Sequence, residues 1–193
     1  AKGGALSKKD FGVAFGGGGG DCCGDCPLIQ EQTNMDGAEG YTDVSYTSEL
    51  FEEGNVNIGK TIRTVAIRLQ KTLNSNNTAC TSCTLSGTVI VSFEGSASTS
   101  CGSLAGADFC GSGTATGCSG DWFTFDNDGE CFSHTIEAGD YLQVYWNHVF
   151  PINQYLTTFR SGTQVIDDET FRYSSNGSAW TDREKNMALK LYG

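Results

Sequence analysis

The chain has 193 residues with 12 basic and 23 acidic side chains, and its formal net charge is -11. This length fits one domain of ordinary size. The acidic balance argues against a surface for nucleic acid or for anionic membranes, because both need clustered Lys and Arg. No run approaches the ~20 consecutive apolar residues of a membrane span, so we expect no membrane insertion.

The N-terminal segment has the pattern of a single strand followed by a flexible linker. Phe11, Val13 and Phe15 alternate with small residues, and a run of five glycines follows at 16–20. One interpretation is a frayed tail. The other is a strand that adds to the sheet of a neighbouring subunit. We predict an arm and linker over residues 1–40 and one domain over 41–193.

Nine cysteines in a chain of this length are dense for a reducing compartment and predict disulfide bonds, which favours an extracellular or virion-surface location. The odd number leaves at least one thiol over. Zinc is the alternative, since two C-x-x-C pairs are present, but they lie much farther apart than the ~15–20 residues usual in compact zinc modules. The disulfide candidates are Cys22, Cys23, Cys26, Cys80, Cys83, Cys101, Cys110, Cys118 and Cys131.

From residue 41 onward the pattern is almost purely β. Short apolar or alternating segments, rich in β-branched and aromatic residues, follow one another closely, and no segment has a helical period with caps. We expect strands at 41–51, 61–69, 85–93, 122–125, 131–136, 141–146, 154–159, 163–166, 170–173 and 187–192. The turn Asp126-Asn-Asp-Gly129 predicts a hairpin between its flanking strands, and residues 95–120 predict a long loop. These features indicate an antiparallel sandwich or barrel.

Several segments resemble a widespread family of domains. They are similar, in chain order, to strands of a jelly-roll-like β-sandwich domain of secreted surface proteins and of phage or virion fibre and decoration proteins. The segments are Ile62 to Lys71, Ser86 to Phe93, Ile136 to Leu142, Arg172 to Thr181 and Met187 to Gly193.

The resemblance implies an all-β, antiparallel jelly-roll-like β-sandwich with the extended N-terminal arm outside it. It also implies a non-catalytic module for adhesion, display or assembly. The family often has an Asp directly before the last strand, where this chain has Asn186. Any role of that Asp in binding a cation or forming a turn is therefore in doubt here.

The chain has no evident catalytic set. Its two histidines, His134 and His148, would need an activated nucleophile beside them. No G-x-S-x-G motif is present. We interpret both histidines as strand residues, at the surface or half-buried, and expect no enzyme activity.

Two groups of acidic residues lie in turn-like segments: Asp126 with Asp128, and Asp167 with Asp168 and Glu169. Acidic pairs can hydrolyse glycosidic bonds, and bent acidic loops can bind calcium. Asp is also common in turns because it bonds to the local backbone. We expect solvated turn acids, with calcium as a weaker alternative and no other cofactor.

The aromatic residues are candidates for a sugar-stacking platform, although large aromatics on strands more often serve as core or contact residues. The tryptophans are Trp122, Trp146 and Trp180, and the accompanying tyrosines are Tyr141, Tyr145, Tyr155 and Tyr173.

Taken together, the sequence predicts a structural, self-assembling subunit of an extracellular filament or virion surface. Copies of the chain would be joined by the arm residues Phe11, Val13 and Phe15, and disulfides would lock the fold. The alternative is a carbohydrate-binding or adhesive module of the same fold, with glycans as partners.

Overall fold

The structure is a computed structural model that describes residues 26–41, 46–73, 78–79, 87–105, 121–147 and 154–193. Within these ranges the chain is all-β, contains no helix, and pairs its strands antiparallel throughout. This confirms the predicted all-β class. No helix in the described ranges is long and apolar enough to cross a membrane.

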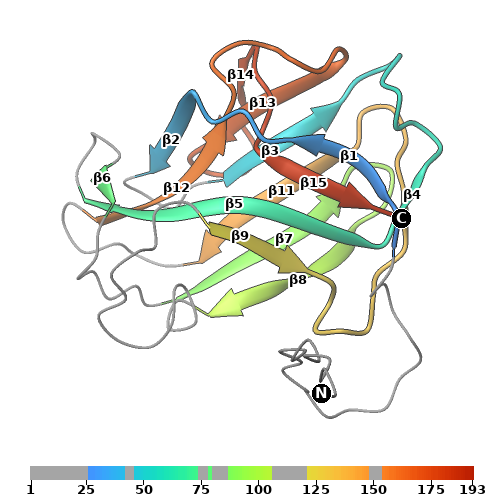
Figure 1. Ribbon diagram of the computed structural model, residues 1–193, viewed down its shortest axis with the longest axis horizontal. Coiled ribbons are helices and arrows are strands. Elements are labelled where there is room, and N and C mark those ends of the chain that lie inside the picture. The colour runs from blue at the N-terminus through green and yellow to red at the C-terminus, as the bar shows by residue number, and fades with distance from the viewer. Residues whose placement is uncertain (1–25, 42–45, 74–77, 80–86, 106–120, 148–153) are drawn as a thin grey trace, which may run out of the picture.

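The first sheet has seven strands and contains both the first and the last described segments (Figure 1). Its main path is β1 (Leu28–Gln32), β15 (Leu189–Tyr192), β5 (Thr64–Leu73), β12 (Gln154–Arg160) and β2 (Gly37–Tyr41). The strands β9 (Asp121–Phe125) and β6 (Thr78–Ala79) also pair with β5. β1 lies before residue 41 and β2 ends at it, so the sheet includes residues predicted to be linker.

The second sheet has six strands. Their order is β14 (Thr181–Arg183), β13 (Glu169–Ser174), β3 (Tyr46–Phe51), β11 (Tyr141–Asn147), β7 (Thr88–Glu94) and β8 (Thr99–Ala105). A separate two-stranded ladder joins β4 (Thr61–Ile62) to β10 (His134–Thr135).

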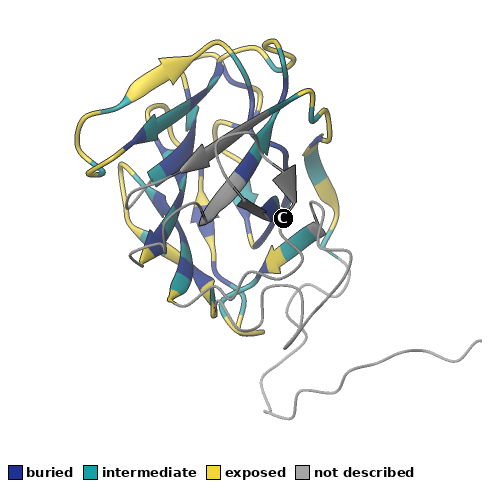
Figure 2. Cartoon of the chain, turned by 90° about the vertical axis from the view of Figure 1, so that its left-hand side faces the viewer, coloured by how far each residue is buried: buried dark blue, intermediate teal, exposed yellow. Residues whose placement is uncertain are grey.

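One hydrophobic core lies between the two sheets. In β11, Leu142, Val144 and Trp146 are buried, whereas the alternate residues Tyr141 and Tyr145 are half-buried on the other face. Both sheets contribute to the same cluster, with Val65, Ile67 and Leu189 from the first and Phe93, Leu142 and Phe171 from the second. Figure 2 places the dark-blue buried segments inside and the yellow exposed segments at loops and edges.

The predicted hairpin around Asp126 is wrong, although its turn is present. Asp126 Oδ1 accepts a hydrogen bond from Gly129 N at 2.9 Å, as expected for a turn acid. The flanking segments do not pair with each other, however: β9 pairs with β5 and β10 pairs with β4. Local turn chemistry therefore set the bend and did not set the strand pairing.

Two further expectations differ from the structure. Residues 163–166 do not form a strand, because the backbone N–H groups of Val165 and Ile166 donate to the side chain of Asn186 instead of to a neighbouring strand. Residues 99–105, expected within a long loop, form β8 and pair with β7. The arm residues Phe11, Val13 and Phe15 lie outside the described residues.

Candidate functional site

The three tryptophans do not form one platform. Trp146 is 1% exposed and belongs to the core, so it is not available to a ligand. Trp122 lies on the seven-stranded sheet, where the ammonium of Lys190 is 4.8 Å from its ring centre and the guanidinium of Arg68 is 5.9 Å away. Trp180 follows β13 and contacts the second sheet, where it meets other aromatic residues.

Four aromatic side chains gather on the outer face of the six-stranded sheet, and we call them the aromatic band: Tyr46, Tyr141, Tyr145 and Trp180. Tyr46 and Tyr145 are cross-strand partners whose rings stack at 4.4 Å. Trp180 meets Tyr46 edge-on at 6.4 Å and Tyr141 at 5.7 Å. All four are half-buried, so the band is a partly accessible surface.

Arg172 lies within the aromatic band. Its guanidinium carbon is 4.2 Å from the ring centre of Tyr141 and 4.6 Å from that of Trp180, which is close enough for cation–π attraction. Its Nε donates to Ser48 Oγ at 2.8 Å. Burial lowers the pKa of Arg172, while the nearby Tyr141 and Asp182 act in the opposite direction. These contacts fix the positions of Tyr141 and Trp180 relative to the sheet.

A tight turn between β13 and β14 brings Trp180 onto this face. Ser174 Oγ accepts from the backbone N–H groups of Asn176 and Gly177, and Asn176 Oδ1 accepts from those of Ser178 and Ala179. Gly177 has a φ of 73°, which favours glycine. A Cβ atom there would also lie 3.0 Å from the ring of Tyr46.

A row of polar side chains crosses the strands beside the aromatic rings. The register places Arg172, Ser48, Gln143 and Ser92 directly opposite one another on β13, β3, β11 and β7. Ser92 Oγ donates to Glu94 Oε1 at 2.7 Å. The amide of Gln143 has no hydrogen-bond partner among the described residues and is half-buried. Ser48 and Ser92 are buried, so the accessible part of this face combines flat apolar rings with the Gln143 amide, the mixture that polar small-molecule sites use.

A second group of polar residues is buried inside the molecule, and sequence reasoning missed its centre. Glu49 and Glu169 are both 0% exposed, and their carboxyl groups lie close enough to influence each other's ionisation. Burial and the neighbouring Glu169 raise the pKa of Glu49 well above its usual value. Burial also raises the pKa of Glu169, against the effect of its amide donors. Glu169 is thus not the solvated turn acid that the sequence predicted.

Amide side chains surround this carboxyl pair and direct their N–H groups at it. Glu169 Oε1 accepts from Asn55 Nδ2 at 3.0 Å and from Asn57 Nδ2 at 3.2 Å, and its Oε2 accepts from Gln30 Nε2 at 2.9 Å. A bound cation would need oxygen atoms there instead. The arrangement suits negative charge and is a poor metal site.

Asn186 orients the other half of this network. Its Oδ1 accepts from Val165 N at 2.7 Å and Ile166 N at 2.9 Å. Its Nδ2 donates to Glu49 Oε1 at 3.0 Å and to the backbone oxygen of Glu169 at 3.2 Å. An ionised Asp could accept the first two bonds but could not donate the last two, which gives a physical reason for Asn at this position.

His134 is buried, not at the surface, and joins a chain of hydrogen bonds. Its Nε2 is 3.0 Å from Asp140 Oδ2, and its Nδ1 is 3.0 Å from Thr99 Oγ1. The ring stacks on Phe93 at 4.3 Å. Asp140 also accepts from Ser96 N and Glu137 N at 2.7 and 2.9 Å. Because His134 and Asp140 are 4% and 0% exposed, this acid–histidine–hydroxyl chain has the position of a structural element. His148 lies outside the described residues.

The remaining acids proposed for calcium do not converge. Asp128, Asp167 and Asp168 are exposed and Asp126 is half-buried. Within the described ranges, no three His, Cys, Asp or Glu side chains are grouped so that they could hold a metal ion.

The described cysteines correct part of the disulfide prediction. Cys101 and Cys131 are thiols in this structure, not halves of disulfides. Cys101 belongs to the core, where burial raises its pKa. Cys26 is half-buried at the start of the described chain. The other candidates, Cys22, Cys23, Cys80, Cys83, Cys110 and Cys118, lie outside the described residues.

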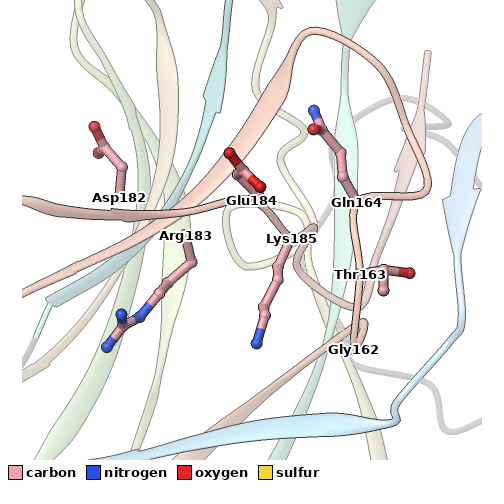
Figure 3. Close-up of a pocket in the computed structure, with 7 residues that line it drawn as sticks. All are labelled: Gly162, Thr163, Gln164, Asp182, Arg183, Glu184 and Lys185. Carbon is pink, nitrogen blue, oxygen red and sulfur yellow. The ribbon is translucent and has the colours of Figure 1, made fainter.

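An open groove of about 580 Å³ lies beside β14, and no residue pattern had indicated it (Figure 3). It is lined by Gly162, Thr163, Gln164, Asp182, Arg183, Glu184 and Lys185. Arg183 and Lys185 extend to one side of the chain, while Asp182 and Glu184 extend to the other. The guanidinium of Arg183 already donates a hydrogen bond from Nη2 to the hydroxyl oxygen of Tyr173 at 3.0 Å. Mixed charge without aromatic lining makes this groove a weaker site than the aromatic band.

The chain matches no protein-family model, no curated protein and no solved structure. The aromatic band is therefore interpreted from its own geometry. Of its members, the sequence singled out Trp180, Tyr141 and Tyr145, and it missed Tyr46 as well as the neighbouring Arg172. Alternation along β3 and β13 predicts that Tyr46 and Arg172 face outward. Only the strand register shows that they lie beside the other aromatic residues.

Proposed function

We propose that this chain is a carbohydrate-binding, adhesive β-sandwich module and that it binds glycans on the outer face of the six-stranded sheet. The observation that supports this is the aromatic band beside the polar row of Arg172, Ser48, Gln143 and Ser92. Sugar rings offer apolar C–H faces that pack on aromatic rings, and hydroxyls that bond to amides and guanidinium groups.

The outer faces of the two sheets differ in the polar groups that they leave available to a ligand. Around Trp122, Lys190 is already paired with Glu31 at 2.6 Å and also lies over the indole ring. On the opposite face, the Gln143 amide is unsatisfied and lies between Tyr141 and Tyr145 along β11. This second face therefore offers a ligand an available amide beside aromatic rings, whereas the cations of the first face already contact the indole ring of Trp122.

The test is to screen the protein on a glycan array and titrate the best glycan by calorimetry. We expect Gln143→Ala and Trp180→Ala each to weaken binding by about fivefold, since one polar contact or one aromatic contact is worth roughly 1 kcal/mol. Trp122→Ala is the matched control and should leave binding unchanged. Equal losses in all three variants, or no glycan bound by the parent protein, would overturn the proposal.

For the fold and the setting, we propose a jelly-roll-like β-sandwich on an extracellular or virion surface. The support is the pair of antiparallel sheets over one core, a chain with only 18% charged residues, and nine cysteines. In this proposal, disulfides form among the cysteines other than Cys101 and Cys131.

The self-assembling subunit remains a second proposal, in which the arm residues Phe11, Val13 and Phe15 add a strand to a neighbouring copy. The observation that favours it is that β8 and β14, the two ends of the six-stranded sheet, each pair on one side only within the described residues. Deletion of residues 1–20 tests it: polymers or higher oligomers seen by electron microscopy should disappear. If the parent protein is a monomer, this proposal fails while the glycan proposal stands.

A further inference from the structure

The buried pair Glu49 and Glu169 joins four separate parts of the chain. Glu49 belongs to β3 and Glu169 to β13, and these strands are neighbours in the six-stranded sheet. The amides of Asn55 and Asn57 reach Glu169 from the loop after β3. Gln30 reaches it from β1, which belongs to the other sheet. The pair is therefore a junction between the two sheets.

β1 is attached to this junction through side-chain amides. It is an edge strand whose only pairing partner among the described residues is β15. Ile29 packs against the core, whereas Leu28 at the start of the strand is 49% exposed. Gln30 bonds to Glu169, and Gln32 Nε2 donates to the backbone oxygens of Asn186 and Met187 at 3.0 and 3.3 Å. Side-chain amides thus supply much of its attachment.

The donor count decides where the proton of the pair resides. Glu169 accepts three amide N–H bonds, which suit an ionised carboxylate. Glu49 accepts from Asn186 Nδ2 and from Met187 N at 2.7 Å, and it faces Glu169. Two ionised carboxylates in contact and without solvent repel each other strongly, so the stable state has one proton on Glu49 that is donated to Glu169.

We propose that the Glu49–Glu169 pair is a proton-dependent clasp for β1: one shared proton keeps β1 attached, and loss of that proton releases the strand. The release would occur at the end of β1 that continues into the N-terminal segment. The clasp is independent of the glycan-binding face.

The charged groups around the pair leave this dependence intact. From the loop after β3, Lys60 Nζ donates to Asn57 Oδ1 at 3.1 Å and stays exposed. From the segment before β13, Asp167 and Asp168 are exposed. From β1, Glu31 pairs with Lys190 instead. Before β15, Asn186 and Met187 bring no charge. No described cation contacts either carboxyl group directly.

The sign of the effect follows from the raised pKa of Glu49. A carboxyl group whose pKa is higher in the folded state than in the unfolded state stabilises the fold at low pH. That contribution is lost as the pH rises through the folded-state pKa. Deprotonation therefore favours opening, by about tenfold per pH unit for one proton.

The experiment is hydrogen exchange of the β1 amides, Leu28–Gln32, followed by mass spectrometry between about pH 5 and pH 9 and corrected for intrinsic exchange. We expect protection in β1 to fall by up to about tenfold per pH unit at the alkaline end, while protection in β11 stays constant. Glu49→Gln keeps a donor toward Glu169 at every pH and should remove the slope. Glu31→Gln, on the outer side of the same strand, should keep it.

Several outcomes would overturn the proposal. One is a pH-independent β1 in the parent protein, and another is a slope that persists in Glu49→Gln. A slope shared equally by β1 and β11 would mean global unfolding. If Glu49→Gln does not fold, the parent protein is compared with Glu31→Gln. A different pH slope of β1 protection in Glu31→Gln would show that the titrating group lies outside the pair.

Discussion

Glu49 and Asp140 are both 0% exposed, yet their surroundings shift their acidity in opposite directions. Burial raises the pKa of both groups. At Asp140 the backbone N–H groups of Ser96 and Glu137, with His134, more than offset burial, so its pKa is lowered. At Glu49 the neighbouring Glu169 adds to burial, so its pKa is raised. Burial raises the pKa of both carboxyl groups, and their hydrogen-bond partners decide whether that effect is outweighed, as at Asp140, or reinforced, as at Glu49.

This difference gives the two sites opposite effects on stability. The Glu49 site stabilises the fold in acid and loses that contribution as the pH rises. The Asp140 site stabilises the fold above the unfolded-state pKa of about 4, and loses that contribution as the pH falls through its lower folded-state pKa. The free energy of unfolding should therefore decline at both ends of the pH range, for reasons located in different parts of the molecule.

The largest effect should come from Asn186→Asp, which turns the Glu49 site into a cluster of three acids. The variant loses the Nδ2 bonds to Glu49 and to the backbone oxygens of Ile166 and Glu169. We expect about 3–5 kcal/mol of destabilisation near neutral pH, measured by chemical denaturation. Stability should partly recover in acid as the new carboxyl group becomes protonated.

The control for this variant is Asn34→Asp, because Asn34 is exposed and bonds locally to Asp36 N at 3.0 Å. It should change stability by less than about 0.5 kcal/mol. If Asn186→Asp behaves like this control, the hydrogen-bond assignment at the Glu49 site is wrong.

The strands were largely predictable from the sequence because alternation of apolar residues reports burial on one side. Leu142, Val144 and Trp146 show it clearly, and β11 forms where expected. The same alternation would have placed Glu49 inside, two residues before Phe51. A glutamate on the inner face looks like a break in the pattern, however, unless its partner is known. That partner, Glu169, is 120 residues away along the chain, among acids that resemble a turn.

The aromatic band was predictable in kind but not in membership. Tyr141 and Tyr145 are four residues apart on one strand and therefore lie on the same face, which the sequence showed. Trp146 was assigned with them and belongs to the core, because adjacent strand residues face opposite ways. The pairing of Tyr46 with Tyr145 depends on strand order, and strand order is set by contacts between distant segments.

The smaller effect should come from Asp140→Asn at the other site. An Asn is neutral and has one acceptor oxygen in place of two, so the N–H of either Ser96 or Glu137 loses its acceptor. We expect a loss of about 1–3 kcal/mol near neutral pH and a flatter decline of stability below about pH 4. Thermal unfolding at several pH values measures both.

The control is Thr99→Val, which removes only the hydroxyl beside His134 Nδ1. It should cost about 1 kcal/mol and keep the acid decline. If Asp140→Asn keeps the parent protein's full acid decline, another carboxylate is responsible, and the contrast between Glu49 and Asp140 does not control the pH range of this fold.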